Sequence, residues 1–155
     1  MAGRVEALWT KRAHRQVMDP TERVSMTRGK GIETDANYGR AKRQVTVIEK
    51  EVFDRIRAEL PDVEPYMRRA NVMVSGIRLE NSRDHVLTLG EVRIRLYGET
   101  RPCERMDAQV PGLTAALDPS WNGGAYGVVL NDGDVAVGDT ASLTAPEQQA
   151  APAAD

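Results

Sequence analysis

The chain has 155 residues, of which 41% are hydrophobic and 28% charged, and its formal net charge is -2 at pH 7. This composition is typical of one globular domain with a buried core, and the near-neutral charge provides no global field that would attract nucleic acid or a membrane. The charge is uneven, because residues 1–50 contain 11 Lys and Arg against 6 Asp and Glu. A basic amino-terminal third could face a phosphate-bearing ligand, although a solvated surface with a chance imbalance explains it equally well.

The cysteine and histidine content narrows the class of protein further. Cys103 is the single cysteine, which excludes an internal disulfide, and two histidines make a zinc site of Cys and His ligands implausible. The opening MAGRVEALWTKR lacks the apolar centre of a signal peptide, and no apolar run reaches membrane-spanning length. We therefore expect a cytoplasmic protein with a reduced thiol, no membrane contact and no nucleic-acid partner.

The first half of the chain predicts two strands and one helix. RVEALW, at 4–9, can open the first strand, and a charged connection follows it. The glycine-rich polar stretch 29–42 predicts a loop, and the β-branched residues of 43–49 predict a strand. Residues 50–60 place their apolar side chains on one helical face, and Pro61 ends that helix.

The second half is richer in strand patterns. Residues 70–79 predict a strand interrupted at Gly76, and 85–99 predict two strand segments joined near Gly90. Residues 110–119 offer a short helix.

The carboxy-terminal part predicts a hairpin and a tail. Residues 124–143 contain two strand patterns around NDGD, and Asp-Gly turns of this kind join hairpins. The Ala, Pro and Gln-rich residues 145–155 predict a disordered tail after a single domain at 1–144. Many short strands with one good helix predict a mainly β fold, a closed or nearly closed β-barrel with a few short helices.

Cys103 lies between two arginines in RPCER, directly after a strand pattern. Neighbouring cations favour the thiolate, the form that attacks electrophiles or binds metals, while Glu104 and Asp107 oppose it. A buried cysteine that acts as a small hydrophobe is the slightly better interpretation on local chemistry alone, since RPCER lacks a histidine base.

Taken in order, the fragments resemble a MOSC domain, the module named after the carboxy-terminal region of molybdenum cofactor sulfurases. The resemblance covers roughly residues 29–143, with RVEALW as a plausible first strand. It is carried by GKGIETD, RQVTVIE, RRANVMVSGIRL, LGEVRIRL, RPCERMD, GLTAAL and GGAYGVVLNDGDVAVGD.

The resemblance implies a MOSC-type β-barrel and a site. Its functional cysteine matches Cys103, as a molybdenum ligand and the residue that carries the chemistry. The family's RxN stretch matches Arg69 and Asn71, and the basic strand start matches Arg43. We expect Arg43, Arg69, Asn71 and Arg101 to bind the molybdenum cofactor (molybdopterin), with at least two of the three arginines lining one cleft with Cys103.

The resemblance leaves three functions open. The first is a stand-alone MOSC protein that binds the molybdenum cofactor and supports reductive chemistry on N-hydroxylated compounds, with electrons from a separate donor protein. The second is a sulfur carrier that takes sulfur as a Cys103 persulfide from a pyridoxal phosphate-dependent cysteine desulfurase, a sulfurtransferase role. The third is a non-catalytic ligand-binding module.

Two departures from the family pattern favour that third function. Family members commonly have a histidine two residues after GD, whereas this chain has Thr34, Asp35 and then Asn37. They often have an arginine before the paired glycines, where this chain has Asn122.

Overall fold

Eleven strands and one helix form the described part of the chain, which in this computed structural model comprises residues 3–13, 18–63, 70–100, 112, 115–116 and 121–146. The elements are β1 (Gly3–Thr10), β2 (Asp19–Thr21), β3 (Arg23–Thr27), β4 (Gly31–Ile32), β5 (Val45–Glu49), α1 (Lys50–Glu59), β6 (Val72–Ser75), β7 (Val86–Leu89), β8 (Val92–Glu99), β9 (Ala125–Val129), β10 (Gly133–Ala136) and β11 (Thr140–Thr144).

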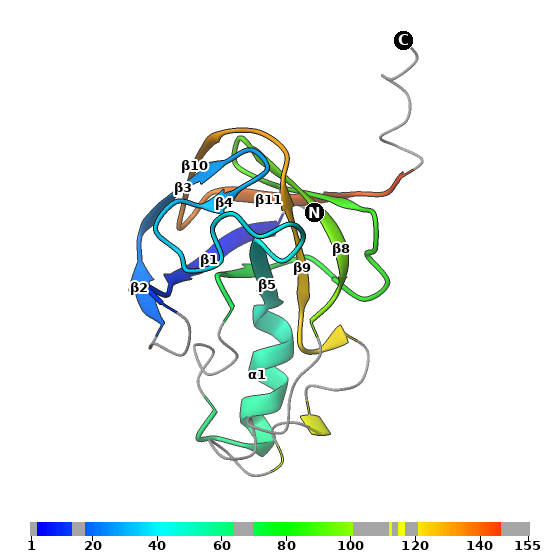
Figure 1. Cartoon of the computed structure of the whole chain (residues 1–155). Coiled ribbons are helices and arrows are strands. Elements are labelled where there is room, and N and C mark those ends of the chain that lie inside the picture. Colours follow the sequence, from blue (N-terminus) through cyan, green and yellow to red (C-terminus); the bar gives the residue numbers. More distant parts are fainter. Residues whose placement is uncertain are drawn as a thin grey trace.

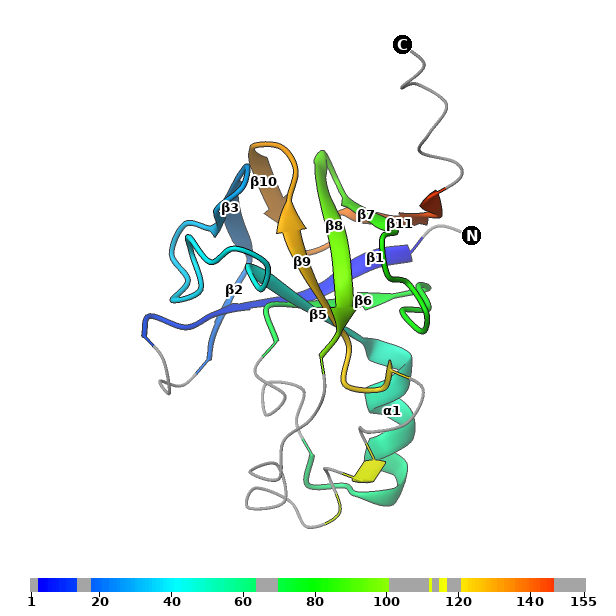
Figure 2. The ribbon, with the colours of Figure 1, turned by 45° about the vertical axis from the view of Figure 1, so that its right-hand side comes forward.

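Seven of these strands form a closed barrel. Their order is β11-β7-β8-β9-β5-β6-β1, and β1 pairs with β11 to close the ring, with β2 added beside β1. All barrel pairings are antiparallel except β5 with β6, which α1 connects as a crossover. Figures 1 and 2 show α1 packed beneath one end of the barrel. The fold is therefore mainly β, as the sequence predicts.

Two apolar cores follow from the alternation of side chains along the strands. In β8, Val92, Ile94 and Leu96 are buried within the barrel, and Arg93 and Arg95 point to solvent. The second core lies between the barrel wall and α1. It contains Trp9, Met18, Ile48, Val52, Phe53, Ile56, Val63, Ala70 and Met73.

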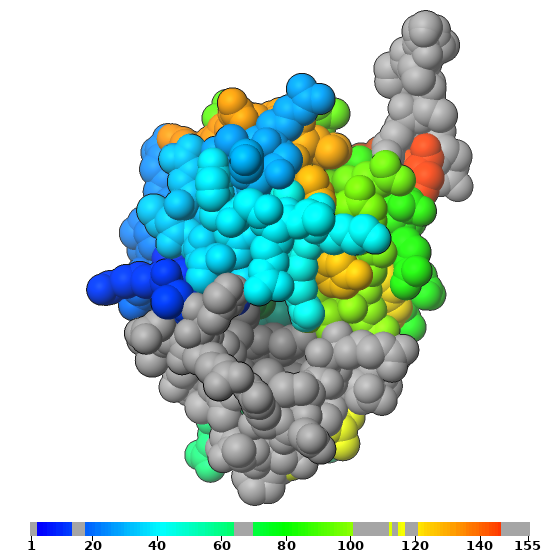
Figure 3. Space-filling model, in the orientation of Figure 1, coloured from blue at the N-terminus to red at the C-terminus, as the bar shows by residue number. Residues whose placement is uncertain are grey.

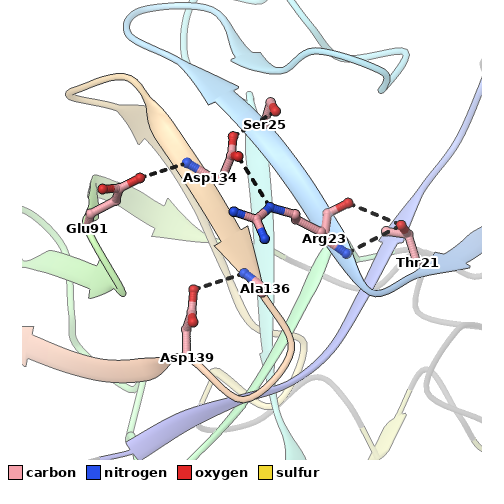
Figure 4. A network of polar contacts seen from close by, with 7 residues as sticks. All are labelled: Thr21, Arg23, Ser25, Glu91, Asp134, Ala136 and Asp139. Carbon is pink, nitrogen blue, oxygen red and sulfur yellow. Dashed lines mark hydrogen bonds and ion pairs between the residues drawn. The ribbon is translucent and has the colours of Figure 1, made fainter.

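A separate three-stranded sheet, in the order β10-β3-β4, lies at the end of the barrel away from α1 (Figures 1 and 2). Asp134 on β10 accepts hydrogen bonds from Ser25 Oγ (2.8 Å) and Arg23 Nε (3.2 Å) on β3 (Figure 4). These two bonds hold the pKa of the Asp134 carboxyl below its ordinary value. The carboxylates of Glu91 and Asp139 accept from the Asp134 and Ala136 amides, which ties this sheet to the barrel.

Several sequence predictions are confirmed at the level of elements. The helix at 50–60 ends at Glu59, before Pro61, and the strand at 43–49 is β5. The two segments around Gly90 are β7 and β8, and the strand before Gly76 is β6.

The predicted hairpin at 124–143 is wrong. β9 and β10 flank the turn at residues 130–132 but do not pair: β9 lies between β8 and β5, and β10 pairs with β3. The segment also contains a third strand, β11, which pairs with β7 and β1. Residues 18–27, assigned from sequence largely to a charged connection, contain β2 and β3.

Other predictions stay untested. The helix at 110–119 and the tail at 145–155 lie mostly outside the described residues. The described part of the chain contains no helix with the length and apolar character of a membrane span.

Candidate functional site

Asn71, one of the predicted cofactor residues, lies at a buried junction directly before β6. Its Oδ1 accepts hydrogen bonds from the Thr46 amide (3.1 Å) and the Thr46 hydroxyl (3.2 Å) on β5. Its Nδ2 donates to the Trp9 carbonyl and to Asp35 Oδ1, both at 3.2 Å. The side chain is only 2% exposed, so these bonds fix three segments around one amide.

Asp35 extends this junction into the 29–42 loop. Its buried carboxylate accepts hydrogen bonds from the Lys11 amide (2.9 Å) and the Asn37 amide (3.0 Å), besides the one from Asn71. Asn37 in turn donates from Nδ2 to the Arg43 carbonyl oxygen (3.1 Å). A continuous series of hydrogen bonds thus leads from the start of β6 to the backbone of Arg43.

Arg43 lies two residues before β5. Its guanidinium carbon is 5.5 Å from the centre of the Tyr126 ring on β9, a cation–π distance. The Tyr126 hydroxyl is 3.3 Å from the position that a Cβ on Gly98 would take, so glycine on β8 makes room for the ring. Arg43 is exposed, and it forms no ion pair with another described residue.

The structure brings Arg43 and Asn71 to the same part of the barrel wall. Thr46 hydrogen-bonds to Asn71 on one side and is the register partner of Tyr126 on the other. Cys103, Arg69 and Arg101 lie outside the described residues, so the expected gathering of arginines with the cysteine stays a prediction.

The end of β8 is the described point nearest in sequence to Cys103. Thr100, three residues before the cysteine, is buried, and its amide donates to the Gly124 carbonyl (2.8 Å). Gly124 immediately precedes β9, the strand that carries Tyr126. The last described residue before Cys103 is therefore hydrogen-bonded to the residue before β9, and the pair of β8 and β9 carries Gly98 and Tyr126.

The two family departures have structural partners in this chain. Asn37 is buried between Asp35 and Arg43, as described above. Asn122 is half-buried and donates from Nδ2 to the Ala116 carbonyl (3.0 Å). Both asparagines thus make hydrogen bonds within the protein.

The described residues alone do not assemble a metal centre, since they contain no group of three His, Cys, Asp or Glu side chains placed to hold an ion. A pocket of about 360 Å³ lies beside β1 and β2, with two glutamates in its lining, and it contains none of the predicted site residues. Its carboxylates would repel a phosphate. The lining residues are Glu6, Ala7, Leu8, Trp9, Pro20, Thr21, Glu22 and Val137.

The closed barrel and its crossover helix place the chain in the class of β-barrel proteins. Comparison with known proteins identifies the family. The sequence profile described as MOSC domain matches residues 34–142, and the chain belongs to the MOSC domain family. No protein with a curated description matches the sequence significantly.

Solved structures agree on the fold. The YuaD protein from Bacillus subtilis is similar with a TM-score of 0.81 and 20% identity, over 94% of this chain and 97% of that chain. YiiM from Escherichia coli has a TM-score of 0.69 and 17% identity, over 97% and 76%. YiiM from Geobacillus stearothermophilus has a TM-score of 0.71 and 15% identity, over 92% and 75%.

Sequence reasoning did not single out Thr46, Tyr126 and Gly98. Thr46 is the polar residue that interrupts the apolar run of β5, and a polar residue there marks an outward position with a partner. Tyr126 falls within GGAYG, where the glycines mark a close approach of neighbouring backbone. Neither signal identifies the partner, because each contact is made across strands.

Proposed function

We propose that this MOSC domain binds the molybdenum cofactor, with Cys103 as the protein ligand to molybdenum. Membership of the family supports the class of cofactor. The observation in this structure that carries the proposal is Arg43, an exposed cation fixed beside Tyr126 without a carboxylate partner among the described residues.

The residues present fit a phosphate-bearing pterin. A phosphate bound in a cleft needs cations or amides, because an unpaired charge there is heavily penalised. The forked donors of an arginine suit phosphate oxygens. The Arg43 backbone is held by Asn37, and its side chain rests on Tyr126, so little side-chain entropy is lost when an anion binds.

Asn71 and Asp35 have a positioning role in this proposal. Both polar atoms of the Asn71 side chain are engaged with protein groups, and these groups belong to β1, β5 and the loop that precedes Arg43. The junction thus fixes where Arg43 leaves the barrel. Arg69 and Arg101 remain proposed as further phosphate contacts.

Cys103 supplies a soft sulfur donor, which suits a metal centre of this kind when deprotonated. Arg101 and Arg105, its neighbours in sequence, favour the thiolate, while Glu104 and Asp107 oppose it. When bound, the cofactor supplies reductive oxygen removal, for which we propose N-hydroxylated compounds as the substrate class and a separate protein as the electron donor.

Metal analysis tests the proposal. The protein is purified from a host that makes the cofactor, and molybdenum is measured by mass spectrometry for the wild type, Cys103→Ser, Arg43→Glu and the control Arg93→Glu. We expect near-stoichiometric metal in the wild type and the control. We expect at least a roughly tenfold loss in the other two, from the lost ligand and the reversed charge.

A wild type without molybdenum overturns the proposal. In that case the intact mass after incubation with a cysteine desulfurase and cysteine decides between the two other functions. A gain of one sulfur that Cys103→Ser abolishes identifies a sulfur carrier. An unchanged mass leaves the ligand-binding module.

A further inference from the structure

The loop before β5 presents a basic surface that the proposed cofactor site does not use. Residues 28–42 contain four Lys and Arg against two Asp and Glu, and one of the two acids, Asp35, is buried. Arg28, Lys30, Tyr38 and Lys42 are exposed, and we call these four residues the docking surface. In Figure 3 the cyan segment around residues 30–45 forms a continuous surface on the face toward the viewer.

One buried amide holds the two halves of this surface together. Gln44 is 1% exposed, and its Nε2 donates to the Gly29 carbonyl (2.8 Å) and the Arg40 carbonyl (2.7 Å). Its Oε1 accepts from the Val129 amide (3.1 Å) on β9. The Gly39 amide adds a bond to the Lys30 carbonyl (2.8 Å). These bonds hold the backbone at Gly29 and Lys30 beside the backbone at Gly39 and Arg40.

The cations of the docking surface have no carboxylate partner within the described residues. Six pairs elsewhere neutralise their cations, among them Arg23 with Asp134 and Arg95 with Asp84. Arg28, Lys30 and Lys42 form no ion pair within the described residues.

Two carboxylates lie nearby and offset part of the positive charge. Glu33 accepts from the Thr27 hydroxyl and Asp132 from the Arg28 amide, each at 2.8 Å. The three exposed cations still exceed these two carboxylates by one charge, and none of the three is in an ion pair within the described residues.

Tyr38 gives the surface an aromatic anchor. It is 41% exposed, and it is the one large hydrophobic residue that is exposed in the described part of the chain. Tyrosine is enriched among the residues that dominate protein interfaces, since its ring offers apolar area and its hydroxyl stays hydrogen-bonded. Unpaired cations around an exposed tyrosine match an acidic protein surface.

We propose that the docking surface binds a small acidic electron-carrier protein. The proposal rests on the function proposed above, because it places the partner beside Arg43 and the cofactor. A nucleic acid fits less well, since a protein that contacts about 6–10 phosphates needs a comparable number of Lys and Arg, whereas the docking surface has three cations. The charges would steer encounter with the partner and make its binding dependent on salt.

Binding measurements test this with a flavodoxin as the acidic probe and a single-stranded oligonucleotide as the second probe. Dissociation constants are measured by fluorescence anisotropy at low and physiological salt for wild type, Lys30→Glu/Lys42→Glu, Tyr38→Ala and the control Arg83→Glu/Arg93→Glu. The control arginines are exposed and form no ion pair within the described residues. Their substitution changes the net charge by the same amount as that of the two lysines. Arg43 is left unchanged, so that the cofactor site is intact.

We expect flavodoxin to bind the wild type more weakly as salt rises. We expect the double substitution Lys30→Glu/Lys42→Glu to weaken binding by about tenfold or more. We expect the control to change it by less than about twofold. Equal weakening by both pairs, no flavodoxin binding at low salt, or tighter binding of the oligonucleotide overturns the proposal.

Molybdenum content separates this proposal from the previous one. Unchanged metal with lost flavodoxin binding in the Lys30/Lys42 pair supports docking. Loss of metal in that pair overturns docking, because the lysines would then act on the cofactor site. A wild type without metal that still binds flavodoxin through these lysines removes the proposed function and leaves the docking surface standing.

Discussion

At the scale of single residues, the most demanding position is Asn71. A buried amide carries two donors and an acceptor that each need a partner, and here Trp9, Asp35 and Thr46 supply them. Each of those partners is itself buried and would lose a hydrogen bond if the amide were removed. The residue that the family resemblance marks as a ligand contact is therefore also a structural junction.

We expect Asn71→Ala to lower the free energy of unfolding by about 3 kcal/mol, since several buried polar groups lose their partner. Urea denaturation measures the change. Asn131→Ala is the matched control: its amide also bridges two backbone groups, of Arg93 and Glu91, but in an exposed place where water can replace it. Its expected cost is about 1 kcal/mol. Equal losses in the two variants would contradict the assigned role of burial.

At the scale of elements, the junction between β5 and α1 carries a buried carboxyl group. Glu49 is 3% exposed, and burial raises the pKa of its side chain above the ordinary value of 4.5. A hydrogen bond from the Leu79 amide (3.2 Å) and the charges of Arg78 and Arg55 oppose the shift, while Glu51 adds to it. The folded state therefore favours the protonated carboxyl more than the unfolded state does.

The sign of the pH dependence follows from this. The contribution of Glu49 to stability is full below pH 4.5 and is lost as the pH rises through its folded pKa. We expect the free energy of unfolding of Glu49→Gln, minus that of the wild type, to increase from pH 4 to pH 7, as followed by urea denaturation. A difference that stays flat or decreases over this range would rule out a raised pKa at Glu49.

Entry into β9 depends on glycine. Gly124 and Gly39 have nearly the same backbone angle, φ +95° and +93°, in the region that favours glycine. A Cβ at Gly124 would overlap the Val47 carbonyl oxygen on β5, whereas one at Gly39 meets nothing within 4 Å.

The two glycines therefore predict different costs for the same substitution. We expect Gly39→Ala to destabilise by about 1–2 kcal/mol, from backbone strain alone. Gly124→Ala adds a backbone clash and should cost more than about 3 kcal/mol. Thermal unfolding measures both. A Gly124→Ala variant as stable as Gly39→Ala would show that the contact between β5 and β9 yields to the extra atom.

At the scale of the whole molecule, the sequence could predict what depends on neighbours along the chain. The alternation in β8 and the single apolar face of α1 are local patterns, and both elements are where the patterns indicate. The pairing of β10 with β3 is not local, since its register joins Asp134 to Ser25. The contacts of the candidate site are also distant in sequence and therefore could not be predicted: Asn71 contacts Trp9 and Asp35, which are 62 and 36 residues away.

Closure of the barrel makes the molecule depend on its last strand. β11 pairs with β7 over four residues and with β1 at Gly3 and Arg4, so it joins the two ends of the sheet. Removing it would leave two exposed strand edges and open the apolar interior, which includes Ala141. The residues beyond it, which the sequence predicts to be a tail, carry no apolar pattern that a core could use.

The two truncations that separate these parts should behave oppositely. Deletion of residues 147–155 is expected to change the free energy of unfolding by less than about 0.5 kcal/mol. Deletion of residues 140–155 removes β11, and we expect loss of cooperative unfolding and binding of a hydrophobic dye, because the β1 and β7 edges then have no partner. Circular dichroism during heating checks both. If the shorter deletion unfolds the protein, the tail packs on the barrel and the domain extends beyond residue 144. If the longer deletion still melts cooperatively, the barrel does not need β11 to close.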